Sequence, residues 1–140
     1  MQEEHRIRRH VEFCETDMAG VVHHSNFIRY FEATEADLLR SVDLSLHDPE
    51  QRWMWPRVKY ACKYLAPVTF EDEIEISICV KHVGRSSIHY EGHIHRLGAE
   101  GVIKAVEAEW VVVCTEVQNS SGRRVSREVP EVFRRLLPPI

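Results

Sequence analysis

A strict alternation of apolar and polar residues between Glu73 and Val80 is the feature of this chain that most constrains its fold. The residues that share one face of an extended strand there are all branched and apolar: Ile74, Ile76, Ile78 and Val80. Successive side chains of a strand point to opposite faces, so this period of two predicts a strand with one buried face. The next segment repeats the pattern, with an apolar face made of Ile88, Tyr90, Gly92 and Ile94.

Short turns separate these strands from their neighbours. Val83-Gly84-Arg85 lies between the two, and residues 97–101 contain two glycines before a long final strand expected over 102–115. Connections of this length are typical of antiparallel hairpins. Two earlier strands are expected, one over residues 57–65, which Ala66-Pro67 ends, and one with a shared face made of Ile7, Arg9, Val11 and Phe13. A loop over 119–124 and a short terminal helix over 130–137 complete the chain.

A long amphipathic helix is predicted from Phe27 to about Val42. Its apolar stripe at helical spacing consists of Phe27, Phe31, Leu38 and Val42, flanked by Ile28 and Leu39. Ser25 is the expected N-cap, because its hydroxyl can accept a hydrogen bond from the first turn. Glu35 falls inside the stripe and Glu32 at its edge, and a buried carboxylate needs a partner. A structural ion pair with Arg29, Arg40 or a strand residue is the favoured interpretation, and a second catalytic acid is the alternative.

One helix and one antiparallel sheet must cover each other's apolar faces, which predicts an α+β fold. The 140 residues fit a single domain, with no internal repeat and no linker long enough to separate two. Lys and Arg total 18 against 22 Asp and Glu, and this mildly acidic balance argues against a nucleic-acid or membrane-surface partner. No apolar run approaches the roughly 20 residues of a membrane span.

The compartment expected from the sequence is the cytoplasm. The first residues are charged and lack the apolar core of a signal peptide. The four cysteines, at 14, 62, 79 and 114, contain no CxxC pair, and buried free thiols are expected in a reducing compartment. A structural zinc site or a disulfide framework is therefore not predicted.

The chemistry is expected where Asp17 precedes the start of the helix. The carboxylate is followed by Gly20, a short apolar link and the first helical residues. A helix start offers unpaired backbone N–H groups and a partial positive charge, which can hold a carbonyl oxygen. Asp17 could then act on the carbonyl carbon, either by activating water or by direct attack. The alternative is an acid that only caps a turn.

The motif Asp17-x-x-Gly20-Val21-Val22-His23-His24, followed by Phe27 and a helix that carries Glu32, resembles the acyl-CoA thioesterases of the 4-hydroxybenzoyl-CoA thioesterase type, and most closely their YbgC-like branch. The segment from Tyr64 to Asp72 fits the same pattern. Two positions depart from it: His23 stands where the family usually has an aromatic residue, and Glu35 where the YbgC-like branch often has a basic one. Because of these two departures, the motif does not identify the acyl group of the substrate.

The resemblance implies a hotdog fold, in which a curved antiparallel sheet of about five strands wraps a long central helix. It implies hydrolysis of an acyl-CoA to the free acid and CoA, with Asp17 as the catalytic carboxylate and the thioester oxygen held near His24. We expect Gly20, Val22, His23 and Ser25 to bind the substrate around them. It also implies a homodimer or homotetramer with the site at a subunit interface, and no metal or bound cofactor, since CoA is part of the substrate.

Several alternatives remain open from the sequence. An enoyl-thioester hydratase of the same fold and a non-catalytic acyl-thioester binding module are the rival functions. A metal-binding strand face is a minor alternative for His89, Glu91, His93 and His95. Trp53 and Trp55, on either side of Met54, could border a pocket, form a subunit contact or pack in the core. The candidates for the CoA phosphates by charge alone are Arg57, Lys59, Lys63, Lys81, Arg85 and Arg123.

Overall fold

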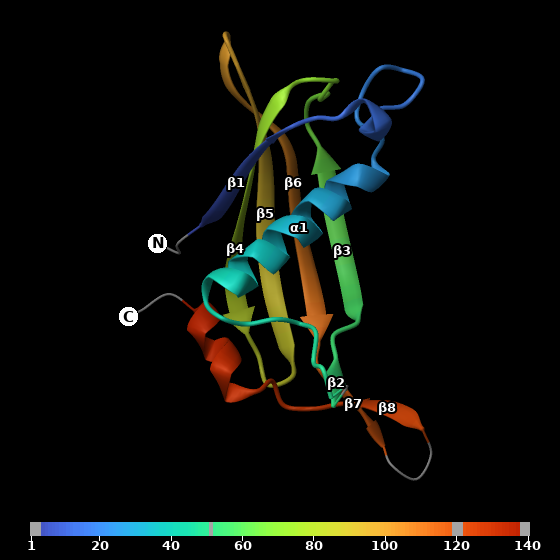
Figure 1. Cartoon of the computed structure of the whole chain (residues 1–140), viewed down its shortest axis with the longest axis vertical. Coiled ribbons are helices and arrows are strands. Elements are labelled where there is room, and N and C mark those ends of the chain that lie inside the picture. The colour runs from blue at the N-terminus through green and yellow to red at the C-terminus, as the bar shows by residue number, and fades with distance from the viewer. Residues whose placement is uncertain (1–3, 51, 119–121, 138–140) are drawn as a thin grey trace.

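A five-stranded antiparallel sheet and one long helix make up most of the protein, as seen in a computed structural model that describes residues 4–50, 52–118 and 122–137. The strand order is β1-β4-β5-β6-β3. The bounds of these strands are β1 His5–His10, β3 Arg57–Tyr64, β4 Glu73–Val83, β5 Ser87–Gly98 and β6 Gly101–Val113. The helix α1, Ser25–Ser41, lies across one face of the sheet (Figure 1). The predicted α+β hotdog arrangement is confirmed.

The two alternating segments form the buried centre of the sheet. Ile76 pairs with Ile94 across β4 and β5, and both side chains are fully buried beneath the helix. The predicted apolar faces are therefore the faces that pack on α1. Because a strand buries every second residue, one face of each strand is left for polar side chains.

Helix and sheet pack closely at Gly92 of β5. A Cβ atom built there would lie 2.6 Å from the Phe31 ring and 2.9 Å from the ring of Trp110. The Phe31 and Trp110 rings are 5.0 Å apart, and Tyr90 stacks on Trp110 at 5.4 Å. The missing side chain at position 92 thus creates the space in which Phe31 anchors α1 to the sheet.

The first strand is shorter than predicted. Residues 7, 9 and 11 do turn inward, but β1 ends at His10 and Phe13 is 75% exposed. Phe13–Glu15 forms a single 3-10 turn, η1, which Glu12 and Glu15 close with a reciprocal capping box. These hydrogen bonds turn the chain out of the sheet before Phe13, so placing Phe13 on the buried strand face was wrong.

The helix begins two residues earlier than predicted, and Ser25 is not its N-cap. The N-cap is His24, which has helical dihedral angles (φ −54°, ψ −28°) and no capping side chain. Because the helical geometry already starts at His24, Ser25 falls in the first turn, and its hydroxyl lies 2.8 Å from Nδ1 of His23. At the other end, Asp43 adopts a positive φ of 58° and Leu44 donates to the Leu39 carbonyl, which closes the helix.

A second, small sheet was not predicted. It contains β2 Trp53–Met54, β7 Thr115–Gln118 and β8 Arg123–Ser126 in the order β2-β7-β8. The predicted loop over 119–124 is wrong at Arg123 and Arg124, which belong to β8, while residues 119–121 lie outside the described part of the chain. The predicted terminal helix is a 3-10 helix, η2, over Glu131–Leu136.

The described cysteines are all free. Cys14 is exposed, Cys62 and Cys79 are half-buried, and Cys114 is fully buried, where burial raises the pKa of its thiol to about 11. The expectation of buried thiols is thus correct for Cys114 and wrong for Cys14. In the described residues no helix is both long and apolar enough to cross a membrane.

Candidate active site

Asp17 sits in a tight turn held by its own backbone and side chain. Its N–H donates to the Val21 carbonyl and its carbonyl accepts from the Gly20 N–H, at 2.9 and 3.0 Å. One carboxylate oxygen, Oδ1, accepts from the Ala19 N–H at 2.8 Å. Gly20 has a φ of +82°, a conformation that favours glycine and allows the tight turn. In the described part of the chain, no donor lies within hydrogen-bond distance of Oδ2.

The helix start lies next to this turn. The N–H of Ser25 donates to Nδ1 of His23 at 3.2 Å, and the N–H of Asn26 donates to the His23 carbonyl at 2.9 Å. The backbone N–H of His24 has no acceptor among the described residues. Of the N–H groups at His24 and Ser25, the one at His24 is therefore available and the one at Ser25 is already used.

Asp17 and His24 border one apolar hollow of about 420 Å³. Its walls come from the helix start and from the segment that follows β3. Apart from Asp17 and His24, the lining residues are uncharged: Val21, Val22, Phe27, Tyr64, Leu65, Ala66, Pro67 and Val68. The segment after β3 is held in place by a hydrogen bond from the Val22 N–H to the Val68 carbonyl at 2.7 Å. Asp17 therefore borders the apolar hollow at the helix N-terminus.

A second, more polar hollow borders Asp17. It includes His23 and Ser25 but not His24, and its lining residues are Phe13, Cys14, Thr16, Asp17, Met18, His23, Ser25, Asn26 and Arg29. The His23 ring stacks on the His24 ring at 4.2 Å, between the two hollows. The predicted site residues are therefore divided: Val22 and His24 belong to the apolar hollow, His23 and Ser25 to the polar one, and Asp17 to both, whereas Gly20 lines neither.

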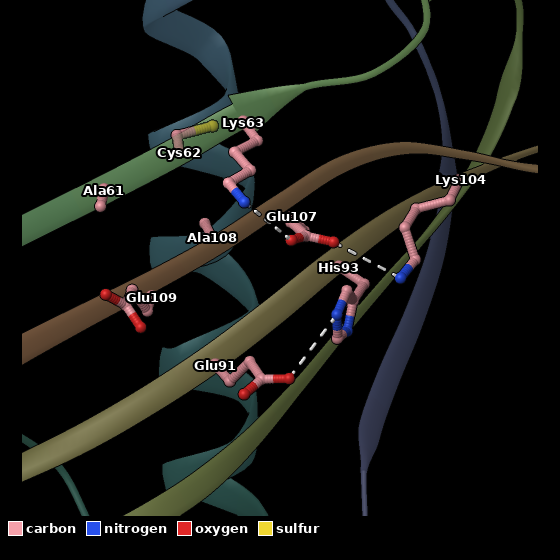
Figure 2. Close-up of a pocket in the computed structure, with 9 residues that line it drawn as sticks. All are labelled: Ala61, Cys62, Lys63, Glu91, His93, Lys104, Glu107, Ala108 and Glu109. Atoms are coloured by element: carbon pink, nitrogen blue, oxygen red, sulfur yellow. Dashed lines mark ion pairs between the residues drawn. The ribbon is translucent and has the colours of Figure 1, made fainter.

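The histidine-rich strand face lies on the side of the sheet away from the helix (Figure 2). A hollow there is lined by paired charges, including His93 with Glu91 at 3.7 Å and Lys63 with Glu107 at 3.9 Å. Burial, and then the nearby His93 and Lys104, lower the pKa of His95. In the described residues, no group of three or more His, Cys, Asp or Glu side chains is arranged to hold a metal ion.

The buried Glu35 has a strand partner. Its carboxylate accepts from the Trp110 indole N–H at 2.7 Å and from the Arg57 guanidinium at 3.3 and 3.4 Å. Glu35 is 3% exposed, whereas Glu32 is exposed and 4.0 Å from Arg57. The favoured interpretation of a structural ion pair is correct for Glu35. Four of the predicted phosphate candidates lie in ion pairs. Arg57 pairs with Glu35, and glutamates of the sheet pair with Lys59, Lys63 and Lys81.

Sequence reasoning missed Glu15 and Asn26, which join the Asp17 turn to the helix start. The Asn26 side chain donates to the Glu15 carbonyl at 2.8 Å. The spacing of Glu12 and Glu15 matches a capping box and was the available signal. No pattern in the sequence indicated that Asn26 would point back to residue 15.

A protein-family model described as the thioesterase-like superfamily matches residues 11–137 of the chain. The acyl-CoA thioester hydrolase YbgC of Escherichia coli is 26% identical over 129 residues, which span 89% of this chain and 91% of that protein. A putative esterase of Aquifex aeolicus is 34% identical over 79 residues, and that match spans 56% of this chain and 62% of the relative.

Solved structures support the same fold. The 4-hydroxybenzoyl-CoA thioesterase of Pseudomonas sp. strain CBS-3 is 21% identical and superposes with a TM-score of 0.81, covering 95% of this chain and 98% of that one. A 1,4-dihydroxy-2-naphthoyl-CoA thioesterase from Synechocystis is 20% identical, with a TM-score of 0.84 and coverage of 94% and 93%. At these identities the likeness concerns the fold.

Proposed function

The chain belongs to the thioesterase-like superfamily and is a thioester hydrolase, and we propose that it cleaves an acyl-CoA into the free acid and CoA with Asp17 as its catalytic carboxylate. The observation that carries this proposal is that Asp17 and His24 border the same apolar hollow. Thioester hydrolysis requires two groups, a carboxylate and an unpaired N–H, and both belong to residues that border this hollow.

The reaction follows from these two groups. The carbonyl oxygen of the thioester accepts a hydrogen bond from the His24 N–H, where the helix dipole stabilises the developing negative charge. Asp17 removes a proton from water as the water oxygen attacks the carbonyl carbon, or attacks that carbon itself to form an anhydride that water then opens. The carbon–sulfur bond breaks and the thiolate of CoA leaves, with little need for an acid, because a thiol has a pKa of about 8.5.

The two hollows suit the two ends of the substrate. The apolar hollow takes the acyl group, since its walls apart from Asp17 and His24 are uncharged. The polar hollow takes the pantetheine arm, whose amides can contact Ser25 and His23. Val22 shapes the acyl side, and Gly20 allows the turn that presents Asp17. These assignments give Val22, His23 and Ser25 a place beside the substrate, and Gly20 a role in the turn.

The remaining properties are proposed together with this reaction. We propose that residues 1–140 act as one catalytic domain and that the enzyme needs no metal or cofactor, CoA being part of the substrate. A homodimer or homotetramer in the cytoplasm is the proposed state, and the free cysteines support a reducing compartment. The partner is the acyl-CoA, with no nucleic acid or membrane.

The test is the substitution Asp17→Asn, which keeps the shape of the side chain and removes its charge. Acetyl-, butyryl-, octanoyl- and benzoyl-CoA are offered to both proteins, and released CoA is followed with a thiol reagent. We expect the kcat of the variant for its best substrate to fall by about 100-fold or more. Asp43→Asn, at the far end of α1, serves as the control and should retain full activity.

Three outcomes would contradict the proposal. Undiminished hydrolysis by a folded Asp17→Asn protein would exclude this carboxylate. A product that keeps its thioester and gains water across a double bond, with an enoyl-CoA as substrate, would indicate a hydratase. Tight binding of acyl-CoA without thiol release over hours would indicate a binding module.

A further inference from the structure

One residue outside the reacting pair links the Asp17 turn to the helix start. The backbone carbonyl of Glu15 accepts two hydrogen bonds, from the N–H of His23 at 2.9 Å and from Nδ2 of Asn26 at 2.8 Å. His24 lies between these two donors in the sequence. Asn26 is only 8% exposed, so its side chain is fixed in this orientation. The position of the His24 N–H is thus set by the position of the Glu15 carbonyl.

The side chain of Glu15 fixes its own orientation in turn. Its two carboxylate oxygens lie 2.6 and 2.7 Å from Nη2 of Arg9 on β1, and Oε1 also accepts from the Glu12 N–H at 2.8 Å. The Arg9 guanidinium lies 4.6 Å above the ring of Tyr30, a buried residue of α1. The Glu15 side chain is 14% exposed, so solvent screens this ion pair less than a surface pair.

These contacts connect the elements around the Asp17 turn and the helix start. Arg9 belongs to β1, Glu12 caps η1, Tyr30 belongs to α1, and Asp17 follows Glu15 by two residues. A change in the Glu15 side chain would move its carbonyl relative to Asn26, and hence the helix N–H relative to the carboxylate. Hydrolysis depends on that separation, because both groups act on one carbonyl.

We propose that Glu15 is a positioning residue for thioester hydrolysis, which holds the Asp17 carboxylate and the His24 N–H at their working separation. It does not contact the reacting atoms. The inference rests on the proposed function, since it assumes that Asp17 and His24 are the reacting groups. It adds a role for a residue that neither the motif nor the apolar hollow contains.

The matched control is Asp48, which has the same kind of contacts away from the site. Its side chain is 3% exposed, and its oxygens accept from the backbone N–H groups of Glu50 and Arg52 and from the Arg52 guanidinium. The Arg52 guanidinium, as its hydrogen-bond partner, lowers the pKa of the Asp48 carboxyl. Asp48→Asn and Glu15→Gln therefore remove equivalent interactions, but only the second adjoins Asp17.

The experiment compares kcat and KM for these two variants with the acyl-CoA that the wild type hydrolyses fastest. Glu15→Gln keeps an oxygen for the Glu12 N–H and loses the charge that pairs with Arg9. We expect its kcat to fall about 10- to 100-fold, with KM changed by less than about 3-fold, because misplaced groups slow the chemical step. The conservative Arg9→Lys variant keeps the charge and should lose less, and Asp48→Asn should keep kcat within about 2-fold.

The outcomes separate this inference from the proposed function. If Asp17→Asn is inactive and Glu15→Gln keeps the wild-type kcat, the positioning role is wrong and the proposed function stands. If Glu15→Gln and Asp48→Asn lose kcat equally, Glu15 has a general structural role and the inference is also wrong. If Glu15→Gln does not fold, the same comparison between Arg9→Lys and Arg52→Lys decides, and equal kcat values for those two variants would overturn the proposal.

Discussion

At the scale of single residues, the two carboxylate oxygens of Asp17 have different surroundings. Oδ1 accepts the Ala19 N–H and fixes the turn, while Oδ2 has no donor in the described part of the chain. The two interpretations drawn from the sequence, a turn cap and a catalytic acid, are thus compatible, because each uses a different oxygen. A base whose position is fixed by its own turn loses little freedom when the substrate binds.

His24 raises a question that a pair of substitutions can answer, namely whether its backbone N–H or its imidazole acts. Its φ of −54° suits a proline ring, and its N–H has no acceptor among the described residues, so His24→Pro removes one donor without breaking an internal hydrogen bond. We expect kcat to fall by about 100-fold or more for His24→Pro, as for loss of an oxyanion donor. We expect a fall of less than about 10-fold for His24→Ala, which keeps the N–H.

The measurement is steady-state hydrolysis of the best acyl-CoA, with circular dichroism to verify that the helix is intact. Equal losses for the two variants would assign the function to the imidazole. A His24→Pro protein with normal kcat would exclude the N–H as the group that holds the substrate oxygen.

At the scale of elements, the alternating strands were the easiest to predict, since burial of one face leaves a period of two in the sequence. Ile74 to Val80 and Ile88 to Ile94 carry that period and are buried as expected. Trp53–Met54 and the β7–β8 pair are too short to show a period, and the pairing of Trp53 with Glu116 joins residues far apart in the chain. The end of β1 was missed because the Glu12–Glu15 capping box overrides the apolar pattern at Phe13.

The site was predictable to the extent that it is local. The Asp17 turn and the helix start are adjacent in sequence, so the motif identified both. Which N–H is free was not predictable, because it depends on the His23 ring accepting from Ser25. The role of Glu15 depends on Arg9 and Asn26, which lie 6 and 11 residues away, and on the fold between them.

Glu35 joins three elements, and its removal is expected to weaken the fold and leave the chemistry intact. Glu35→Ala leaves the Trp110 N–H without its acceptor and leaves the half-buried Arg57 with only the exposed Glu32, at 4.0 Å, as an ion-pair partner. We expect a loss of about 2–4 kcal/mol in the free energy of unfolding, measured by urea titration with tryptophan fluorescence. Glu35→Gln retains an acceptor for Trp110 and should cost about 1–2 kcal/mol.

Glu32→Gln is the control for this experiment, since Glu32 is exposed and 4.0 Å from the same arginine, and we expect a change below about 0.5 kcal/mol. The kcat of all three variants should match the wild type well below their unfolding temperatures. A specific loss of kcat in a stable Glu35→Gln protein would instead support the second catalytic acid that the sequence left open.

At the scale of the whole molecule, the sheet has two edges of different character. Both edge strands carry charges, Arg6 and Arg8 on β1 and Lys59 and Lys63 on β3, but β1 is the shorter of the two. β3 is longer, and apolar side chains are exposed on or just after it: Val58, Tyr64 and Leu65. Tyr64 and Leu65 also line the apolar hollow, so the hollow opens to solvent beside this unpaired edge of the sheet. An assembly through β3 would both cover this edge and complete the wall of the acyl chamber.

This arrangement predicts that the enzyme assembles through β3 and is most active as an oligomer. Light scattering coupled to gel filtration should give two or four times the mass of one chain.

Val58→Lys places a charge at an edge position that is 59% exposed and outside the hollow, and should shift the mass toward one chain. The kcat of this variant at nanomolar concentration should fall by about 10-fold or more, because the acyl chamber loses a wall. Val102→Lys is the control. It changes a valine that is 68% exposed at the start of β6, and it should alter neither the mass nor kcat. A wild-type protein that is monomeric and fully active at that dilution would show that one chain builds the whole site.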